Sequence, residues 1–208
     1  MVIAALVACA VLAPRAGRAQ EQASGREHVG VRVGGLVTSG GLHDKYGDGW
    51  QMSLFFTERI APWFFLDIRI GALYLGDLKD EELDDELTGV QDLGSAMRIL
   101  YFSVGPMVST SLGQNYTGYA TAGVGVYSVS MVFDSGITAF DFSDQDAGFS
   151  GGVGLSRRLS TSWSVEANAT VHYVLVSQTP RDIYYSFTAG AGSPLLLDIA
   201  LGATLDLH

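Results

Sequence analysis

The residues of this sequence that could do chemistry gather first on the segment 163–178, which reads WSVEANATVHYVLVSQ. Ser164, Glu166 and His172 all occupy even positions there, and alternate residues of a strand share one face. A serine nucleophile, a histidine base and an orienting acid are the parts of a serine hydrolase. The G-x-S-x-G turn of many hydrolases is absent, however. We therefore expect His172 to join a polar network, and we predict no catalytic residue.

A second candidate site is the acidic stretch DLKDEELDDE, which places seven carboxylates between Asp77 and Glu86. Carboxylates bind divalent cations, and a surface loop of this kind could bridge lipopolysaccharide phosphates through such ions. The stretch lacks the D-x-[DN]-x-[DN]-G spacing that wraps calcium. We predict a solvated loop and no metal site.

Glycines at 151, 152 and 154 form a third candidate, because glycine-rich loops can cradle phosphates. No helical pattern and no nearby lysine follow them. They are better explained as positions where a strand bends or packs closely. We predict that the protein needs no cofactor.

The N-terminal segment predicts export. MVIAALVACAVLAP is apolar, and Gly17 and Ala19 place small residues where a signal peptidase reads. We expect a signal peptide over residues 1–19, a short polar leader over 20–27 and a single domain over 28–208.

The net charge of the chain limits the kinds of molecule that it could bind. Removing Arg15 and Arg18 with the signal peptide leaves 10 basic residues against 22 acidic ones, which moves the net charge from −10 to −12. Such a balance argues against nucleic acid as a partner. Cys9 would leave with the same segment, so disulfides cannot hold the mature domain together.

The rest of the chain predicts an all-β domain. We find no helical stripe, whereas apolar and polar residues alternate in many segments long enough to cross a bilayer as tilted strands. The eight predicted strands are His28–Thr38, Trp50–Glu58, Trp63–Gly76, Ala96–Thr110, Tyr116–Phe133, Ala147–Arg158, Trp163–Ser177 and Ser193–Leu207.

The connections between these strands alternate strictly between long and short. Long stretches follow the first, third, fifth and seventh strands, including DSGITAFDFSDQD after the fifth, while RIAP, LGQN and LSTS follow the second, fourth and sixth. Membrane barrels of the outer membrane have short turns at one end and longer loops at the other. We expect an eight-stranded antiparallel up-and-down transmembrane β-barrel.

Either face of such strands could be the inside. In a soluble sandwich Val165, Val171 and Leu201 would pack in a dry core; in a membrane barrel they would face lipid and enclose Glu166 and His172. Spanning hydrocarbon with strands requires a closed barrel, since every amide must be hydrogen-bonded. Because the loop alternation and the export segment favour the barrel, we predict apolar faces turned outward.

Three runs carry a resemblance to a known family: YTGYATAGVGVYSV at 116–129, FSGGVGLSRRLSTSWSVEANATVHYV at 149–174, and LLLDIALGATLDL at 195–207. They resemble the eight-stranded outer-membrane β-barrel family, which includes the OmpA-type transmembrane domain and the OmpX-like small barrels. The resemblance implies location in the outer membrane, contact with outer-membrane lipid and lipopolysaccharide, and insertion by the assembly machinery of that membrane. We expect a monomer.

The same frame assigns roles to three sets of residues. Charges enclosed in so narrow a barrel should be paired, and amphipathic rings prefer the two membrane interfaces. The predicted lumen polar network is Arg32, Asp67, Arg69, Glu166, His172 and Asp198. The predicted interface girdle is Trp63, Tyr116 and Trp163 at the turn end, with Trp50, Tyr74, Tyr101, Tyr127, Phe149 and Tyr173 nearer the loop end. The predicted surface contacts, on an outer loop, are Tyr184, Tyr185 and Phe187.

The expected function is non-enzymatic, in envelope structure or surface interaction. A narrow pore for small solutes is the alternative, and a lipid-modifying enzyme with His172 as its base is a third, weaker one.

Overall fold

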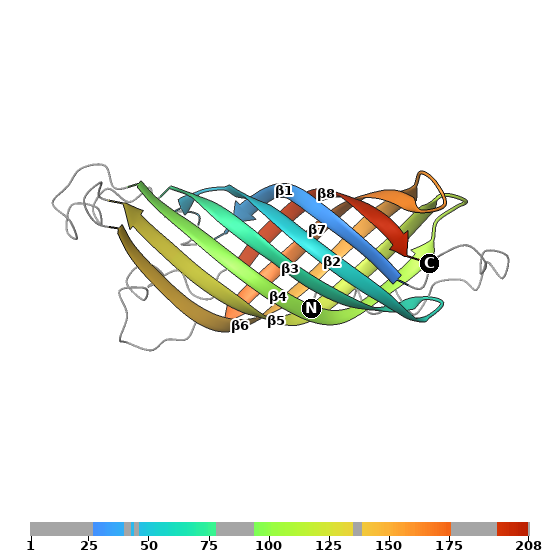
Figure 1. Cartoon of the computed structure of the whole chain (residues 1–208), viewed down its shortest axis with the longest axis horizontal. Helices are drawn as coiled ribbons and strands as arrows, with labels where there is room; N and C mark the ends of the chain where they lie inside the picture. The colour runs from blue at the N-terminus through green and yellow to red at the C-terminus, as the bar shows by residue number, and fades with distance from the viewer. Residues whose placement is uncertain are drawn as a thin grey trace.

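Eight antiparallel strands close into a single barrel (Figure 1). The computed structural model describes residues 27–39, 43, 46–77, 94–134, 139–175 and 195–207. The strands are β1 (Glu27–Thr38), β2 (Gly49–Ala61), β3 (Phe64–Asp77), β4 (Gly94–Ser111), β5 (Tyr116–Asp134), β6 (Ala139–Arg158), β7 (Trp163–Leu175) and β8 (Leu195–Leu207). Each pairs with its neighbours in the chain, and β1 pairs with β8, so the predicted fold class is confirmed. No helix among the described residues is long and apolar enough to span a membrane.

The predicted strands overlap all eight observed ones, and seven begin within a few residues of the prediction. The short connections β2–β3, β4–β5 and β6–β7 lie at one end of the barrel, together with the start of β1 and the end of β8 (Figure 1). We call this the turn end and the opposite one the loop end. The predicted signal peptide (1–19) and most of the leader lie outside the described residues.

The sixth strand corrects the prediction. It begins at Ala139 instead of Ala147, and its ladder with β5 runs to the pair Asp134 and Ala139. Only residues 135–138 separate the two strands, so the predicted long loop between them is wrong, and the alternation of long and short connections fails there. With 18, 19 and 20 residues, β4, β5 and β6 are the longest strands and extend furthest at the loop end (Figure 1).

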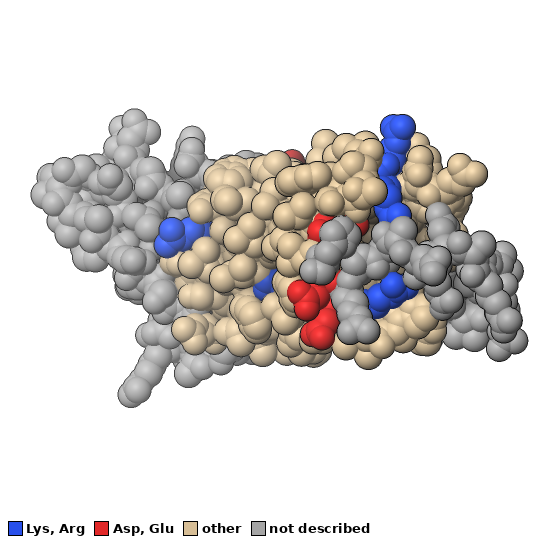
Figure 2. Space-filling model, turned by 45° about the vertical axis from the view of Figure 1, so that its right-hand side comes forward, with Lys and Arg blue, Asp and Glu red and all other residues tan. Residues whose placement is uncertain are grey.

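Side chains alternate between the two faces of the wall, with the apolar face outward. Val165, Val171 and Leu201 are 40 %, 37 % and 68 % exposed. Glu166 and His172, which point to the opposite face, are only 7 % and 1 % exposed. A sandwich with these apolar side chains in a dry core is therefore excluded. Figure 2 shows wide areas of uncharged residues on the visible described surface, interrupted by a few charged side chains.

Inward-facing glycines make room for large rings on neighbouring strands. A Cβ at Gly71 would overlap the ring of Tyr101, its partner across the β3–β4 ladder. Gly154 stands in the same relation to Tyr119 across the β5–β6 ladder. Two further pairs follow the rule, namely Gly30 with Phe55 and Gly148 with Tyr127. Alternating small and large residues is how a narrow barrel fills its interior without forcing the wall apart.

Replacing Gly71 with valine should therefore destabilise the barrel by about 1–3 kcal/mol, because the new side chain displaces the Tyr101 ring from a filled interior. Urea unfolding of the barrel refolded in phospholipid vesicles measures this. Gly35→Val is the matched control, since a Cβ at outward-facing Gly35 has no neighbour within 4 Å. Equal losses for the two variants would contradict the packing rule.

Candidate functional site in the barrel lumen

The six residues predicted to form the lumen network all point inward. Each is between 1 % and 7 % exposed, although they come from four different strands. We call them the polar layer: Arg32 of β1, Asp67 and Arg69 of β3, Glu166 and His172 of β7, and Asp198 of β8. The structure brings them together as three pairs of opposite or complementary groups.

The Arg32 guanidinium is the most heavily engaged group of the layer. Its Nε donates to Glu166 Oε1 at 2.5 Å and its Nη2 donates to the Tyr119 hydroxyl at 3.3 Å. Tyr119 in turn donates to Glu166 Oε2 at 2.9 Å, which closes a ring of three hydrogen bonds. The guanidinium carbon also lies 3.9 Å from the centre of the Phe55 ring, a cation–π contact. Sequence reasoning paired the charges of this layer but missed Tyr119 and Phe55.

His172 pairs with Asp198 across the β7–β8 ladder. Its Nε2 lies 2.9 Å from Asp198 Oδ2, and its Nδ1 lies 3.1 Å from the Tyr127 hydroxyl. The ring centroid of Tyr101 is 4.9 Å from that of His172. Contacts on both ring nitrogens and on a face fix the imidazole in one orientation.

Ser164 and Glu166 do not form a hydrolase constellation with His172. Ser164 is eight residues away on the same strand, about 26 Å at the rise of an extended chain, and Glu166 is about 20 Å away. Glu166 is committed to Arg32 instead. Ser164, Glu166 and His172 do share one face of β7, as predicted. The distances between them along the strand are too great for these three residues to act together in nucleophilic catalysis.

The third pair lies on β3. Arg69 Nε is 2.6 Å from Asp67 Oδ2, although the N–H does not point at the oxygen, so the contact is an ion pair and not a directed hydrogen bond. Among the described residues, Asp67 Oδ1 and Asp198 Oδ1 receive no hydrogen bond from the protein. Buried oxygens of this kind are where ordered water usually binds.

The lumen is not polar throughout, which sequence reasoning did not anticipate. Beyond the polar layer, toward the loop end, the interior holds a cluster of fully buried apolar and tyrosine side chains. We call it the apolar plug: Leu36, Tyr46, Leu73, Leu75, Met97, Ile99, Tyr101, Tyr127, Val129, Val174 and Leu196. Tyr46 comes from the β1–β2 connection, and burial raises the pKa of its hydroxyl.

The plug also corrects part of the predicted girdle. Tyr101 and Tyr127 point inward and are 4 % and 0 % exposed, so they do not face the membrane interface. The other predicted girdle residues face outward: Trp63, Tyr116 and Trp163 at the turn end, and Trp50, Tyr173 and Phe149 toward the loop end, with Tyr74 half-buried. Trp50 and Tyr74 stack with ring centroids 4.1 Å apart.

The predicted surface contacts Tyr184, Tyr185 and Phe187 lie outside the described residues. The acidic stretch that begins at Asp77 also lies outside them, apart from Asp77 itself, which ends β3.

Solved structures share this architecture. A major outer membrane protein from Thermus thermophilus has a TM-score of 0.59 and 18 % identity, covering 87 % of this chain and 99 % of that one. Neisserial surface protein A has a TM-score of 0.58 and 11 % identity over 89 % of this chain and 100 % of that one. Ail, the attachment invasion locus protein of Yersinia pestis, has a TM-score of 0.54 and 11 % identity over 88 % of this chain and 99 % of that one.

No protein-family model and no curated protein sequence matches the chain. The likeness is thus one of fold, at low identity, and it confirms the resemblance that the three runs carry. The chain has the fold of the eight-stranded outer-membrane β-barrels.

Proposed function

We propose that this protein is a non-enzymatic outer-membrane barrel that acts as a membrane-embedded scaffold for surface interaction. The observation that carries this proposal is the filled lumen. A polar layer of mutually paired charges and an apolar plug follow one another along the interior. An eight-stranded barrel is only wide enough for its own side chains to fill it.

The outward face supports a location in the bilayer. Leu201, Ile199 and Val33 are exposed by more than half, and aromatic side chains stand at both ends of the same face. Exposed apolar surface of this extent is unfavourable in water but favourable against acyl chains. The proposed compartment, the outer membrane, follows from the shared fold and from the predicted export segment.

Surface interaction is the role proposed for the loop end. There β4, β5 and β6 extend furthest and provide a platform of paired backbone. Tyr184, Tyr185 and Phe187 belong to the connection that emerges at the same end, and we propose them as contact residues for a partner, since aromatic side chains supply contact area at low entropic cost. Among the proteins with this fold, Ail carries the name attachment invasion locus protein.

Electrical recording tests the scaffold proposal against the pore alternative. The native barrel in a planar bilayer should give no single-channel steps. Opening the plug alone, with Leu36→Ser and Leu196→Ser, should also give none, because the polar layer still seals the lumen. Adding Arg32→Ser and Glu166→Ser to that variant should permit conductance. Steady ion-conducting steps from the native protein would support the pore and reject the sealed scaffold.

A further inference from the structure

Arg98 of β4 is an exposed arginine on the outer, lipid-facing side of the barrel. Ile99 beside it points into the lumen, whereas Leu100 and Phe102 face outward with it. Residues 100–108, whose outward positions are all apolar, match the ~9–11 residues that a tilted strand needs to cross the hydrocarbon. Arg98 therefore stands just beyond the apolar belt at the loop end, at the level of the lipid headgroups.

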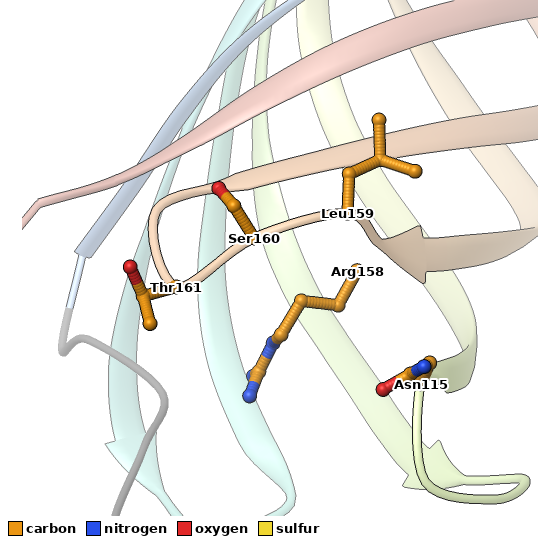
Figure 3. Close-up of a pocket in the computed structure, with 5 residues that line it drawn as sticks. All are labelled: Asn115, Arg158, Leu159, Ser160 and Thr161. Atoms are coloured by element: carbon orange, nitrogen blue, oxygen red, sulfur yellow. The ribbon is translucent and has the colours of Figure 1, made fainter.

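The guanidinium of Arg98 forms no ion pair and no hydrogen bond with any residue that the structure describes. Other arginines are placed differently. Arg32 and Arg69 belong to the polar layer. Arg158 is the ladder partner of buried Ser164, so it stands on the lumen-facing side of β6, where it lines a hollow at the turn end (Figure 3). The exposed charge of Arg98 is thus available to an anion at the membrane surface.

Arg98 has a polar and an aromatic neighbour on the same outer face. Its ladder partner on β5 is the buried Ser130, and its ladder partner on β3 is Tyr74. Directly opposed side chains of an antiparallel pair have Cβ atoms about 4.5–5.5 Å apart. Tyr74 in turn stacks with Trp50 of β2, which is 47 % exposed. These ladder partners form a continuous line across four strands, which we call the outer row: Trp50, Tyr74, Arg98 and Ser130.

The chemistry and the span of the outer row indicate a phosphorylated sugar as its ligand. A guanidinium fork binds phosphate oxygens, and a serine hydroxyl can donate to them. An exposed aromatic face packs against the C–H groups of a sugar ring. Two strand spacings, roughly 9–10 Å, separate Trp50 on β2 from Arg98 on β4. A phosphorylated disaccharide spans this distance more fully than a glycerol phosphate does.

We propose that the outer row binds the headgroup of a phosphorylated glycolipid in the leaflet at the loop end. Arg98 holds a phosphate through its fork, with a further hydrogen bond from Ser130. Tyr74 and Trp50 pack against the sugar. This site rests on the proposed function, because it needs the barrel to stand in a bilayer. It gives the scaffold a preferred lipid at its outer rim.

The test uses the full chain refolded in micelles of lauryldimethylamine oxide, which contain neither phosphate nor sugar. Four probes are titrated separately: a short-chain acylated glucosamine disaccharide carrying a phosphate, the same glycolipid without phosphate, dihexanoyl phosphatidylglycerol, and inorganic phosphate. Nuclear magnetic resonance follows the Arg98 Nε–H and the Trp50 indole N–H. The phosphorylated glycolipid should shift both signals saturably, at a lower concentration than the other three probes.

Variants identify the residues that hold the ligand. Arg98→Gln should raise the half-saturating concentration of the phosphorylated glycolipid about tenfold, and Arg98→Lys by less. Trp50→Leu should weaken binding of the glycolipid and leave that of phosphatidylglycerol unchanged. Arg157→Gln is the matched control, because Arg157 is also exposed on the outer face but lies at the turn end, beside Tyr116. It should change the half-saturating concentration by less than about twofold.

Equal weakening by the Arg98 and Arg157 variants would overturn the site, and so would equal binding of the glycolipid without phosphate. Saturation by phosphatidylglycerol or inorganic phosphate at the same concentration as the phosphorylated glycolipid would reject a sugar-bearing ligand. A folded barrel without any response would overturn the site alone. A chain that stays folded and monodisperse without detergent would instead contradict the proposed membrane location, so the two failures are distinguishable.

Discussion

Replacing Leu201 with arginine should lower the free energy of unfolding of the barrel in a bilayer by about 2–4 kcal/mol. Leu201 is the central residue of β8, and its ladder partners Val33 and Ala167 also face outward. It therefore stands near the middle of the apolar belt, where a guanidinium loses most of its hydration. Urea titration of protein refolded in phospholipid vesicles, followed by tryptophan fluorescence and gel migration without boiling, measures the loss.

Leu195→Arg is the matched control for depth. Leu195 lies on the same strand and the same face, but at the loop-side end, paired with Tyr173 of the girdle. There an arginine can extend its charge to the interface, and the expected loss is about 0–1 kcal/mol. Equal losses at both positions would contradict a membrane-spanning belt. So would a Leu201→Arg variant that folds unchanged in plain buffer.

The closed barrel was predictable because its main signal is local. Strands such as β7 and β8 alternate between apolar and polar residues over most of their length. This period of two can be read from the sequence of one strand alone, without knowing which strands lie beside it. Once the apolar faces are assigned to the outside, the charged side chains on the opposite faces must point into the lumen. Arg32, Glu166 and Asp198 could be assigned to the lumen in this way, although which charge meets which depends on the stagger of the barrel.

The sixth strand was misplaced because its first half reads as a loop. Its segment AFDFSDQD, at 139–146, is acidic and polar, which is typical of connections, yet Phe140 and Phe142 still alternate with Asp141 and Ser143. That alternation is the strand signal that could have located it. A ladder beyond the membrane needs no apolar outer face, so a rule that looks for lipid-facing residues overlooks it.

The apolar plug was missed for a related reason. The prediction assigned apolar residues to the outer face of the barrel, but the segment MRILYFSV of β4 is apolar on both faces. The structure turns Met97, Ile99 and Tyr101 inward and Leu100 and Phe102 outward. Counting by twos from Ser103, which faces the lumen, would have assigned these positions correctly. Tyr101 and Tyr127 would then have been removed from the predicted girdle.

Removing one partner of the Arg32–Glu166 pair should produce the other large effect. Arg32→Met leaves the Glu166 carboxylate buried with Tyr119 as its remaining donor, and the expected loss of stability is about 3–5 kcal/mol. Arg32→Lys should fall between the native protein and Arg32→Met, because an ammonium keeps the charge but cannot reproduce the fork to Glu166 and Tyr119. The same vesicle-based unfolding measurement applies.

The double variant Arg32→Met with Glu166→Leu separates pairing from packing. With both charges gone, no uncompensated ion is buried, and apolar side chains can fill the space against Phe55. Most of the stability lost in Arg32→Met should therefore return. Arg157→Met, an exposed arginine outside any ion pair of the described residues, is the control and should change stability by about 0.5 kcal/mol or less. If the double variant lost as much unfolding free energy as the two single variants together, the two charges would not be coupled. The polar layer would then close the lumen only by filling its space.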